Sequence, residues 1–313
     1  MKTEPELATT QVYLDEEKKA LLWQEYGIDA DSDLFDPRLD FVAKRLLTAE
    51  TKESKKSLIS FLNATLKFKN KKRVVKVLNP VTTVTSQKHK KTVFDVRVEF
   101  SDGSQAIIEI EFRRKDNFKK RSQFIISQSY ANQDISGKTY DALEKRYLIC
   151  IVNYTLFDYV EDDDFHHVHM YRDEKGRPLT DDQTIIFFEL SKLDELLEKP
   201  VGKLTSAERW VIFFRYATDK SKRDILNQIL EKEEGIRLAS QTLQTISMNP
   251  QERRAYEEQL IFELDQRSEV ASAEKRAARA RDVEIAKGLK SDNIPFSVIV
   301  KNTTLTLQEV EEL

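Results

Sequence analysis

Residues 94–114 read FDVRVEFSDGSQAIIEIEFRR, and this stretch decides the fold that the sequence predicts. Asp102-Gly103 separates two runs rich in Val, Ile and Phe, a pattern that favours a β-hairpin. Side chains along a strand point alternately to its two faces. Glu109 and Glu111 therefore share one face of the second strand, and Ile110 between them points to the other.

The length of the turn decides whether Asp95, on the first strand, joins these two glutamates. A loop of two or four residues would leave Asp95 on the opposite face. A three-residue loop over 101–103, with Gly103 in the left-handed conformation, sets Asp95 directly across from Glu109. This is a common hairpin geometry, so we predict this loop and a cluster of three carboxylates, Asp95, Glu109 and Glu111.

The composition is that of a protein with a folded core and no membrane span. Its 313 residues can hold one large domain or one domain with an appendage, and 40% hydrophobic residues suffice for a core. No apolar run approaches the roughly 18 residues of a membrane span, and the acidic N-terminus lacks a signal-peptide core. The single cysteine, Cys150, lies in the apolar run YLICIVNY, which predicts a buried thiol and a reducing compartment. We expect a soluble, cytoplasmic protein.

Charge is distributed unevenly along the chain. The net charge of −3 excludes a chain that is basic overall. Residues 54–94, however, contain no acidic residue and many basic ones, among them Lys71, Lys72 and Arg73, and a second basic group over 113–121 follows the predicted hairpin. Basic segments on both sides of a carboxylate hairpin suit a polyanion. Solvated lysine-rich loops are the alternative interpretation.

The remaining sequence predicts an α/β domain followed by a helical part. We expect a partly mobile N-terminal extension over 1–34, the domain that contains the strands over 35–200, and a helical C-terminal region over 201–313. Besides the hairpin, strands are predicted over 73–78, 147–154, 165–171 and 184–190. Helices are predicted over 16–26, 37–47, 52–67, 117–134, 193–197, 220–248 and 250–287.

Three helix starts have a sequence signal. Asp36-Pro37 predicts an N-cap followed by proline at the first helical position. Thr205 with Glu208, and Thr306 with Glu309, have the spacing of capping boxes. The second of these opens the last of two short helices that we predict over 292–313.

Three carboxylates on a hairpin beside basic segments suit a divalent metal site. Mg²⁺ prefers oxygen ligands, commonly one or two carboxylates together with water and a phosphate oxygen. Such an ion can activate water and stabilise charge on the leaving oxygen of a phosphodiester. Acidic residues on a solvated strand face are the alternative. A zinc site at His166, His167 and His169 is disfavoured, because the first two face opposite sides of a strand and no cysteine lies nearby in the sequence.

The order Asp95, hairpin, Glu109-Ile110-Glu111 and then a helix resembles the core of the PD-(D/E)XK nuclease superfamily. Residues 36–191 more specifically resemble the Rpn family of recombination-promoting nucleases and transposases. The resemblance is carried by LDFVAKRLL at 39–47 with Asp40 and Lys44, KKSLISFLNATL at 55–66, Arg121, Tyr130, Gln133, Gly137 and Tyr140, and FFELSKL at 187–193. The tail after residue 284 resembles the two-helix C-terminus of the family.

This resemblance implies a restriction-endonuclease-like α/β fold, with a mixed central sheet flanked by helices and a helical C-terminal extension. It implies a Mg²⁺-dependent DNA endonuclease in which Asp95, Glu109 and the backbone carbonyl of Ile110 bind the metal, and Glu111 takes part in catalysis. DNA would be held by Lys44, Arg121, Gln133, Lys71, Lys72 and Arg73. DNA recombination or mobile-element biology is the implied context, and a homo-oligomer formed through the helical C-terminal region is a further expectation.

Glu111 departs from the pattern of the family. It stands where the family has Gln and the wider superfamily has Lys, and an ionised glutamate offers neither a hydrogen-bond donor nor a positive charge. It could serve as a further metal ligand or as a base. The alternative is a nuclease-fold protein with weak or no catalysis that binds DNA or a protein partner.

Overall fold

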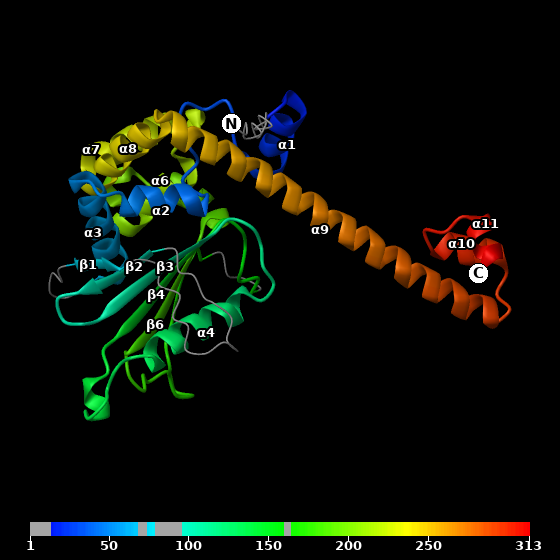
Figure 1. Ribbon diagram of the computed structural model, residues 1–313, viewed down its shortest axis with the longest axis horizontal. Helices are drawn as coiled ribbons and strands as arrows, with labels where there is room; N and C mark the ends of the chain where they lie inside the picture. Colours follow the sequence, from blue (N-terminus) through cyan, green and yellow to red (C-terminus); the bar gives the residue numbers. More distant parts are fainter. Residues whose placement is uncertain (1–13, 68–73, 79–95, 160–163) are drawn as a thin grey trace, which may run out of the picture. The chain divides into compact units, whose positions relative to one another are not determined.

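The computed structural model describes residues 14–67, 74–78, 96–159 and 164–313. They form two compact units. One unit spans residues 31–256 and contains the sheet (Figure 1). The other is made of residues up to 30 together with 257–313. Within the described residues, no helix is both long enough and apolar enough to cross a membrane.

The larger unit is built on a mixed sheet, which in the described part of the chain has six strands in the order β1-β2-β3-β4-β6-β5. The strands are β1 (Val74–Leu78), β2 (Val96–Phe100), β3 (Gln105–Glu111), β4 (Arg146–Val152), β5 (His166–His169) and β6 (Gln183–Glu189). β3, β4 and β6 are parallel, whereas β1, β2 and β5 run antiparallel to their neighbours. β5 lies at an edge of the sheet.

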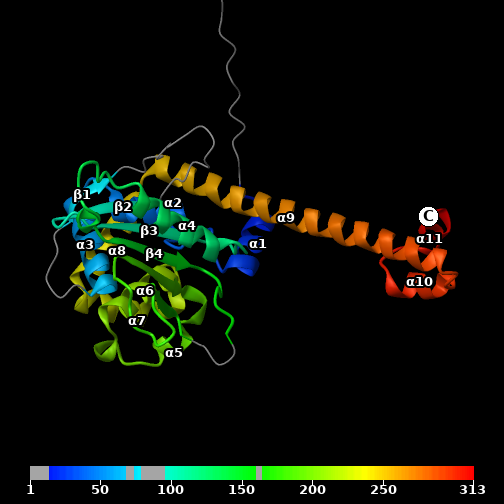
Figure 2. The same ribbon diagram turned by 90° about the horizontal axis from the view of Figure 1, so that it is seen from below.

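The three parallel strands are apolar because both of their faces are covered. α4 (Phe118–Ala131) packs on one face, where its Phe118, Ile125 and Ile126 join Ile107 and Leu148 in a buried cluster. Figure 2, seen from the side of α4, shows this helix in front of the strands. Cys150 is buried in the same cluster, as predicted.

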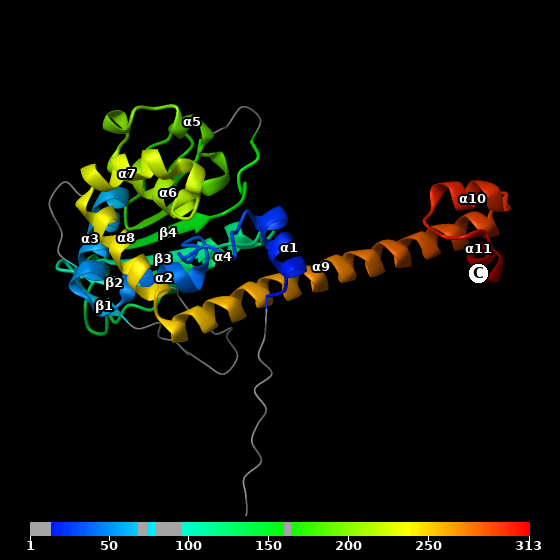
Figure 3. The ribbon, with the colours of Figure 1, turned by 90° about the horizontal axis from the view of Figure 1, so that it is seen from above.

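A layer of helices covers the other face (Figures 1 and 3). It contains α2 (Asp40–Thr48), α3 (Lys52–Leu66), α5 (Asp194–Leu197), α6 (Ser206–Tyr216), α7 (Arg223–Lys232) and α8 (Glu234–Ser247). Trp210 of α6 is fully buried and packs edge-on against Phe61 of α3, with ring centroids 5.5 Å apart. α8 comes so close to α3 at Gly235 that a Cβ there would lie 2.1 Å from the Ser60 hydroxyl. The helices over 206–247 thus belong to the same compact unit as the sheet.

The predicted helix start at Asp36-Pro37 is wrong. α2 begins at Asp40, and Leu39 precedes it without a side-chain cap. The Asp36 carboxylate instead accepts the Arg38 backbone N–H at 2.9 Å and pairs with the Arg38 guanidinium, and both side chains are buried. The Asp36 N–H donates to the Tyr256 hydroxyl at 3.2 Å. A buried ion pair therefore uses the carboxylate that the sequence pattern assigned to a cap.

The buried face of α4 is not uniformly apolar. Phe124 is 52% exposed. Ser122 and Ser129 are buried instead, together with Ile125 and Ile126. Small side chains under a helix allow it to approach the sheet closely, and hydrophobicity alone does not reveal that requirement.

The second unit contains α1 (Glu16–Tyr26), most of the long α9 (Pro250–Ser291), α10 (Phe296–Asn302) and α11 (Leu307–Glu312). Arg267 of α9 pairs with Glu25 of α1 at 2.6 Å. At the other end of α9, Ala286 is buried in a small core with Ile299, Leu305 and Val310. The capping boxes at Thr205 and Thr306 are both present, as predicted. Residues 1–13 of the predicted N-terminal extension lie outside the described residues.

Candidate active site

The β2–β3 hairpin has the predicted register. Val96 pairs with Ile108 and Val98 with Ala106. The Phe100 N–H donates to the Ser104 carbonyl at 2.9 Å, which closes a three-residue loop over 101–103. Gly103 has φ of +80°, the left-handed conformation expected at this position. The loop length on which the predicted carboxylate cluster depends is therefore confirmed.

Glu109 and Glu111 lie on the face of β3 that α4 covers. This follows from the strand alternation, because Ile107 of the same face belongs to the core beneath α4. Glu109 pairs with Cys150 and Glu111 with Val152 of β4, so the backbone at both glutamates is held within the sheet. Glu109 is 2% exposed and Glu111 is 8% exposed. Two buried carboxylates two residues apart repel each other unless positive charge is nearby.

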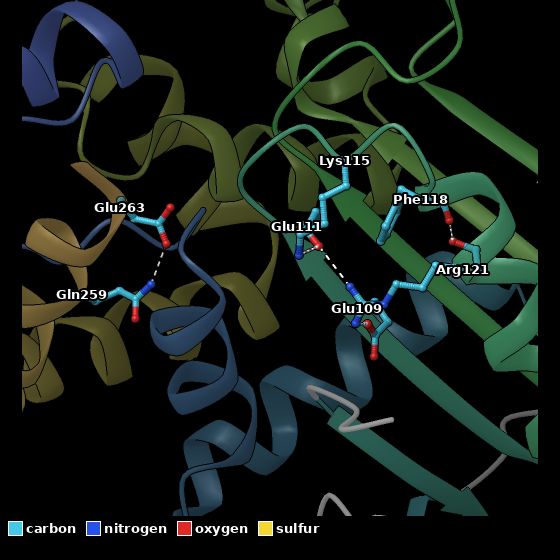
Figure 4. Close-up of polar contacts among 8 residues, drawn as sticks. Glu109, Glu111, Lys115, Phe118, Arg121, Gln259 and Glu263 are labelled. Carbon is cyan, nitrogen blue, oxygen red and sulfur yellow. Dashed lines mark hydrogen bonds and ion pairs between the residues drawn. The ribbon is translucent and has the colours of Figure 1, made fainter. Parts of the chain in front are cut away.

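Two cations next to the site supply that charge (Figure 4). Arg121 donates from Nη2 to Glu109 Oε2 at 2.9 Å and from Nη1 to Glu111 Oε2 at 3.2 Å. Lys115 donates from Nζ to the same Glu111 oxygen at 2.6 Å. The guanidinium therefore bridges the two carboxylates, and the four side chains together have no net formal charge.

The connection from β3 to α4 places these cations. Lys115 lies in the short segment between the two elements, and Arg121 lies in the first turn of α4. Phe118 begins that helix, is fully buried and packs edge-on against Phe187 of β6. The Arg121 guanidinium lies 6.0 Å from the centre of the Phe118 ring. The packing of Phe118 thus fixes the position along β3 that the Arg121 side chain reaches.

Tyr154 adds a phenol close to Glu111. Burial, followed by the negative charge of Glu111, raises the pKa of Tyr154, so its hydroxyl keeps its proton at neutral pH. This hydroxyl is buried, and a hydrogen bond from the Lys115 backbone acts on its pKa in the opposite sense. Lys115 belongs to the basic group over 113–121 for which the sequence predicted polyanion binding, whereas Tyr154 was not singled out. The spacing of four residues between Glu111 and Lys115, just beyond a strand end, was the available signal for their contact.

The remaining predicted site residues are not all near the glutamates. Lys44 is on α2, which covers the face of the sheet opposite to α4 and contacts β2 and β3 (Figure 1). Gln133 follows the far end of α4, about 15 Å along the helix from Arg121. Its amide bonds the backbone of Tyr130 and Glu144. Asp95, Lys71, Lys72 and Arg73 lie outside the described residues.

The donor set suits a hard divalent cation. Glu109 and Glu111 offer carboxylate oxygens, and Ile110, whose backbone carbonyl is the predicted third ligand, lies between them on β3. Mg²⁺ commonly uses one or two protein carboxylates. Among the residues that the structure describes, no three His, Cys, Asp or Glu side chains form a metal-binding group. The third predicted carboxylate, Asp95, is not among those residues.

The histidines of β5 have other contacts. His167 Nε2 lies 2.8 Å from Oε2 of the fully buried Glu189. His166 stacks on Phe188 with ring centroids 4.8 Å apart. Glu189 also accepts hydrogen bonds from the backbone N–H groups of Leu156 and Phe157. His167 and Glu189 thus hold the segment after β4 against β5 and β6.

Comparison with known protein families assigns most of the chain. Residues 37–273 match the PD-(D/E)XK nuclease family transposases, which confirms the predicted resemblance. A comparison with curated proteins gives no match, and a comparison with solved structures gives none. The mixed six-stranded sheet flanked by helices, with a helical C-terminal part, is consistent with the α/β fold of these nucleases. The chain therefore belongs to the PD-(D/E)XK nuclease family of transposases.

Proposed function

We propose that the protein is a metal-dependent endonuclease that hydrolyses phosphodiester bonds in DNA. The observation that carries the proposal is the pair Glu109 and Glu111, which lie buried on one face of β3 with Arg121 and Lys115 within 3.2 Å of their carboxylates. The chain belongs to a nuclease family whose members generally use divalent metal ions. Carboxylates for a metal and cations for a phosphate are the two components that such a reaction requires.

The register predicted from the sequence would set Asp95, which lies outside the described residues, across from Glu109. Asp95, Glu109 and the carbonyl of Ile110 would hold the ion, and Glu111 would position the attacking water or a second ion. Mg²⁺, when bound, would supply Lewis acidity and stabilise negative charge on the leaving oxygen. Residues Lys44, Arg121, Gln133, Lys71, Lys72 and Arg73 would bind the DNA backbone, which makes binding sensitive to salt.

Nicking of supercoiled plasmid DNA with and without Mg²⁺ tests the proposal. Asp95→Ala and Glu109→Ala should each abolish nicking, because each removes a metal ligand. Glu174→Ala is a matched control, since this exposed carboxylate lies in a surface turn of the same unit. Nicking that persists in both site variants would refute the assignment.

A second candidate function is DNA or partner binding by a nuclease fold without turnover. The observation that favours it is Glu111, which stands in the Gln or Lys position of the pattern and is already paired with Lys115 and Arg121. Glu111→Gln separates the two candidates. An endonuclease should keep or gain nicking activity in this variant, whereas a binding protein should show salt-sensitive DNA binding and no cleavage in either form.

The wider setting is also a proposal. Membership of a transposase family supports a role in DNA recombination or in mobile elements. The single buried Cys150 supports a reducing compartment, which we take to be the cytoplasm. We also propose that the helical C-terminal region over 201–313 joins copies of the chain.

A further inference from the structure

We propose that Arg121 and Lys115 exchange partners when the divalent ion binds. They would leave the carboxylates of Glu109 and Glu111 and bind a DNA phosphate, so that metal and DNA strengthen each other's binding. This inference rests on the proposed function. It adds a role for Lys115 and a coupling between the two ligands that membership of the family does not specify.

The first argument is competition for the same oxygens. Oε2 of Glu109 accepts from Arg121, and Oε2 of Glu111 accepts from both Arg121 and Lys115. A divalent ion on these carboxylates would lie next to two positive charges at hydrogen-bond distance. Like charges that close repel strongly in a site with little solvent. The ion and the two side-chain cations are therefore alternative partners of the glutamates.

The second argument is that the carboxylates are buried more deeply than the cations. The side chains of Glu109 and Glu111 are 3% and 11% exposed, whereas those of Arg121 and Lys115 are 35% and 43% exposed. The carboxylates are held by a central strand, and the cations cover them from the solvent side on long side chains with several rotatable bonds. The cations can therefore turn outward without any change in the sheet.

The third argument is the ligand that Arg121 and Lys115 would bind after they leave the glutamates. A guanidinium binds phosphate with the same forked geometry that it uses for carboxylates, and an ammonium binds phosphate as a point charge. DNA approaching from solvent would meet Arg121 and Lys115 before it met the glutamates. The phosphodiester backbone of DNA is a polyanion that fits these two cations.

The consequence is a thermodynamic linkage. If the ion frees both cations for DNA, it raises the affinity for DNA by some factor, and DNA must raise the affinity for the ion by the same factor. Couplings of this kind are commonly between 5- and 150-fold. Removing the cations should therefore strengthen binding of the ion in the absence of DNA and remove the dependence of DNA binding on the ion.

Two measurements on the full chain test the exchange. Binding of Mn²⁺ without DNA is followed by electron paramagnetic resonance, and binding of a labelled DNA duplex is followed by anisotropy at constant ionic strength, with Ca²⁺ or with chelator. Arg121→Gln with Lys115→Gln should tighten Mn²⁺ binding by about tenfold and abolish the gain in DNA affinity on adding Ca²⁺. Arg121→Lys should retain both wild-type behaviours in part, because it keeps the charge.

Lys145→Gln is the matched control, because Lys145 also pairs with a carboxylate, that of Asp181, but at an exposed site. Circular dichroism confirms that each variant is folded. Mn²⁺ binding that is equal in wild type and in the double variant, and abolished by Glu109→Ala, overturns the exchange and leaves the metal site intact. Absence of any Mn²⁺ binding that depends on Glu109 overturns the metal site itself, and the exchange with it.

Discussion

Val96 lies directly opposite Ile108 across β2 and β3. This pair shows that the register set by the turn at Gly103 is kept along the whole of β2, back to its first residue, Val96. A shift of one residue would turn every side chain of one strand to the other face. The metal site proposed above depends on this register, because Asp95 precedes Val96 and Glu109 follows Ile108.

Gly103 should be sensitive to substitution. Its φ of +80° is unfavourable for residues with a Cβ, and a Cβ would lie 3.2 Å from side-chain carbons of Glu144. We expect Gly103→Ala to lower the free energy of unfolding by about 1–2 kcal/mol, measured by urea denaturation. Gly103→Asn should cost less, because asparagine tolerates the left-handed conformation. Equal midpoints for all three proteins would contradict this account of the turn.

His166 should make the fold sensitive to mild acid. Burial, followed by repulsion from Lys67 and His167, lowers the pKa of His166 from 6.5, although Asp164 and Glu208 act in the opposite sense. Its Nε2 is buried and has no hydrogen-bond partner in the described residues. Between pH 6.5 and the lowered pKa of the folded state, the unfolded chain therefore binds more protons than the folded one. The contribution of this group to stability is complete above pH 6.5 and is lost as the pH falls from there through the folded pKa.

The test compares unfolding free energies at pH 7.5 and pH 5.5. His166→Phe keeps a ring to stack on Phe188 and removes the titrating group, so the decrease between the two pH values should be smaller than in wild type. Other groups titrate in both proteins, and the difference between the proteins isolates His166. An identical decrease would show that His166 does not contribute.

Glu189 should be sensitive to substitution although it lies outside the site. It is fully buried and lies 3.2 Å from the ammonium of Lys192, in addition to its contacts with His167 and two backbone N–H groups. Glu189→Leu should destabilise the protein by about 3–5 kcal/mol, because it leaves a buried cation opposite an apolar side chain. Glu189→Gln keeps an acceptor and should cost less. Thermal unfolding measures both, and equal losses would argue against a role for the acceptor.

Deletion of the chain after Arg267 tests the proposed assembly. Residues 267–281 of α9 are all exposed, whereas Tyr256, earlier on the same helix, stacks on Phe35 at 4.3 Å and belongs to the larger unit. A cut after Arg267 therefore spares that packing and the pair with Glu25. If the region joins copies, the full chain should have the mass of an oligomer by light scattering and the deletion variant that of a monomer. A monomeric full chain would contradict the proposal.

The turn, the capping boxes and the apolar strands could be predicted from the sequence, because each depends on residues that are close together in the chain. The turn at Asp102-Gly103 dictates the register of the hairpin through backbone conformation at one glycine. The capping boxes at Thr205 and Thr306 form within four residues. The apolar runs around Cys150 and Phe187 indicate parallel strands because only strands covered on both faces can be apolar throughout.

Features that depend on how elements meet were decided by the tertiary structure. Asp36 lost its predicted capping role because the fold buries it with Arg38 beneath Tyr256, and a buried charge must be paired. Gln133 was grouped with Arg121 as a DNA-binding residue. In the structure its amide bonds the backbone of Tyr130 and Glu144, because the fold places those groups next to it.

By itself, then, the sequence determined that Glu109 and Glu111 share one face of a strand, since alternation and turn length are properties of a short segment. Only the tertiary structure decided that Arg121 and Lys115 occupy those carboxylates. That contact requires α4 to begin at one position over the sheet. The packing of Phe118 against Phe187 of β6 fixes this position. The physical reason is that strand geometry follows from neighbouring residues, whereas the partner of a charge follows from packing between elements.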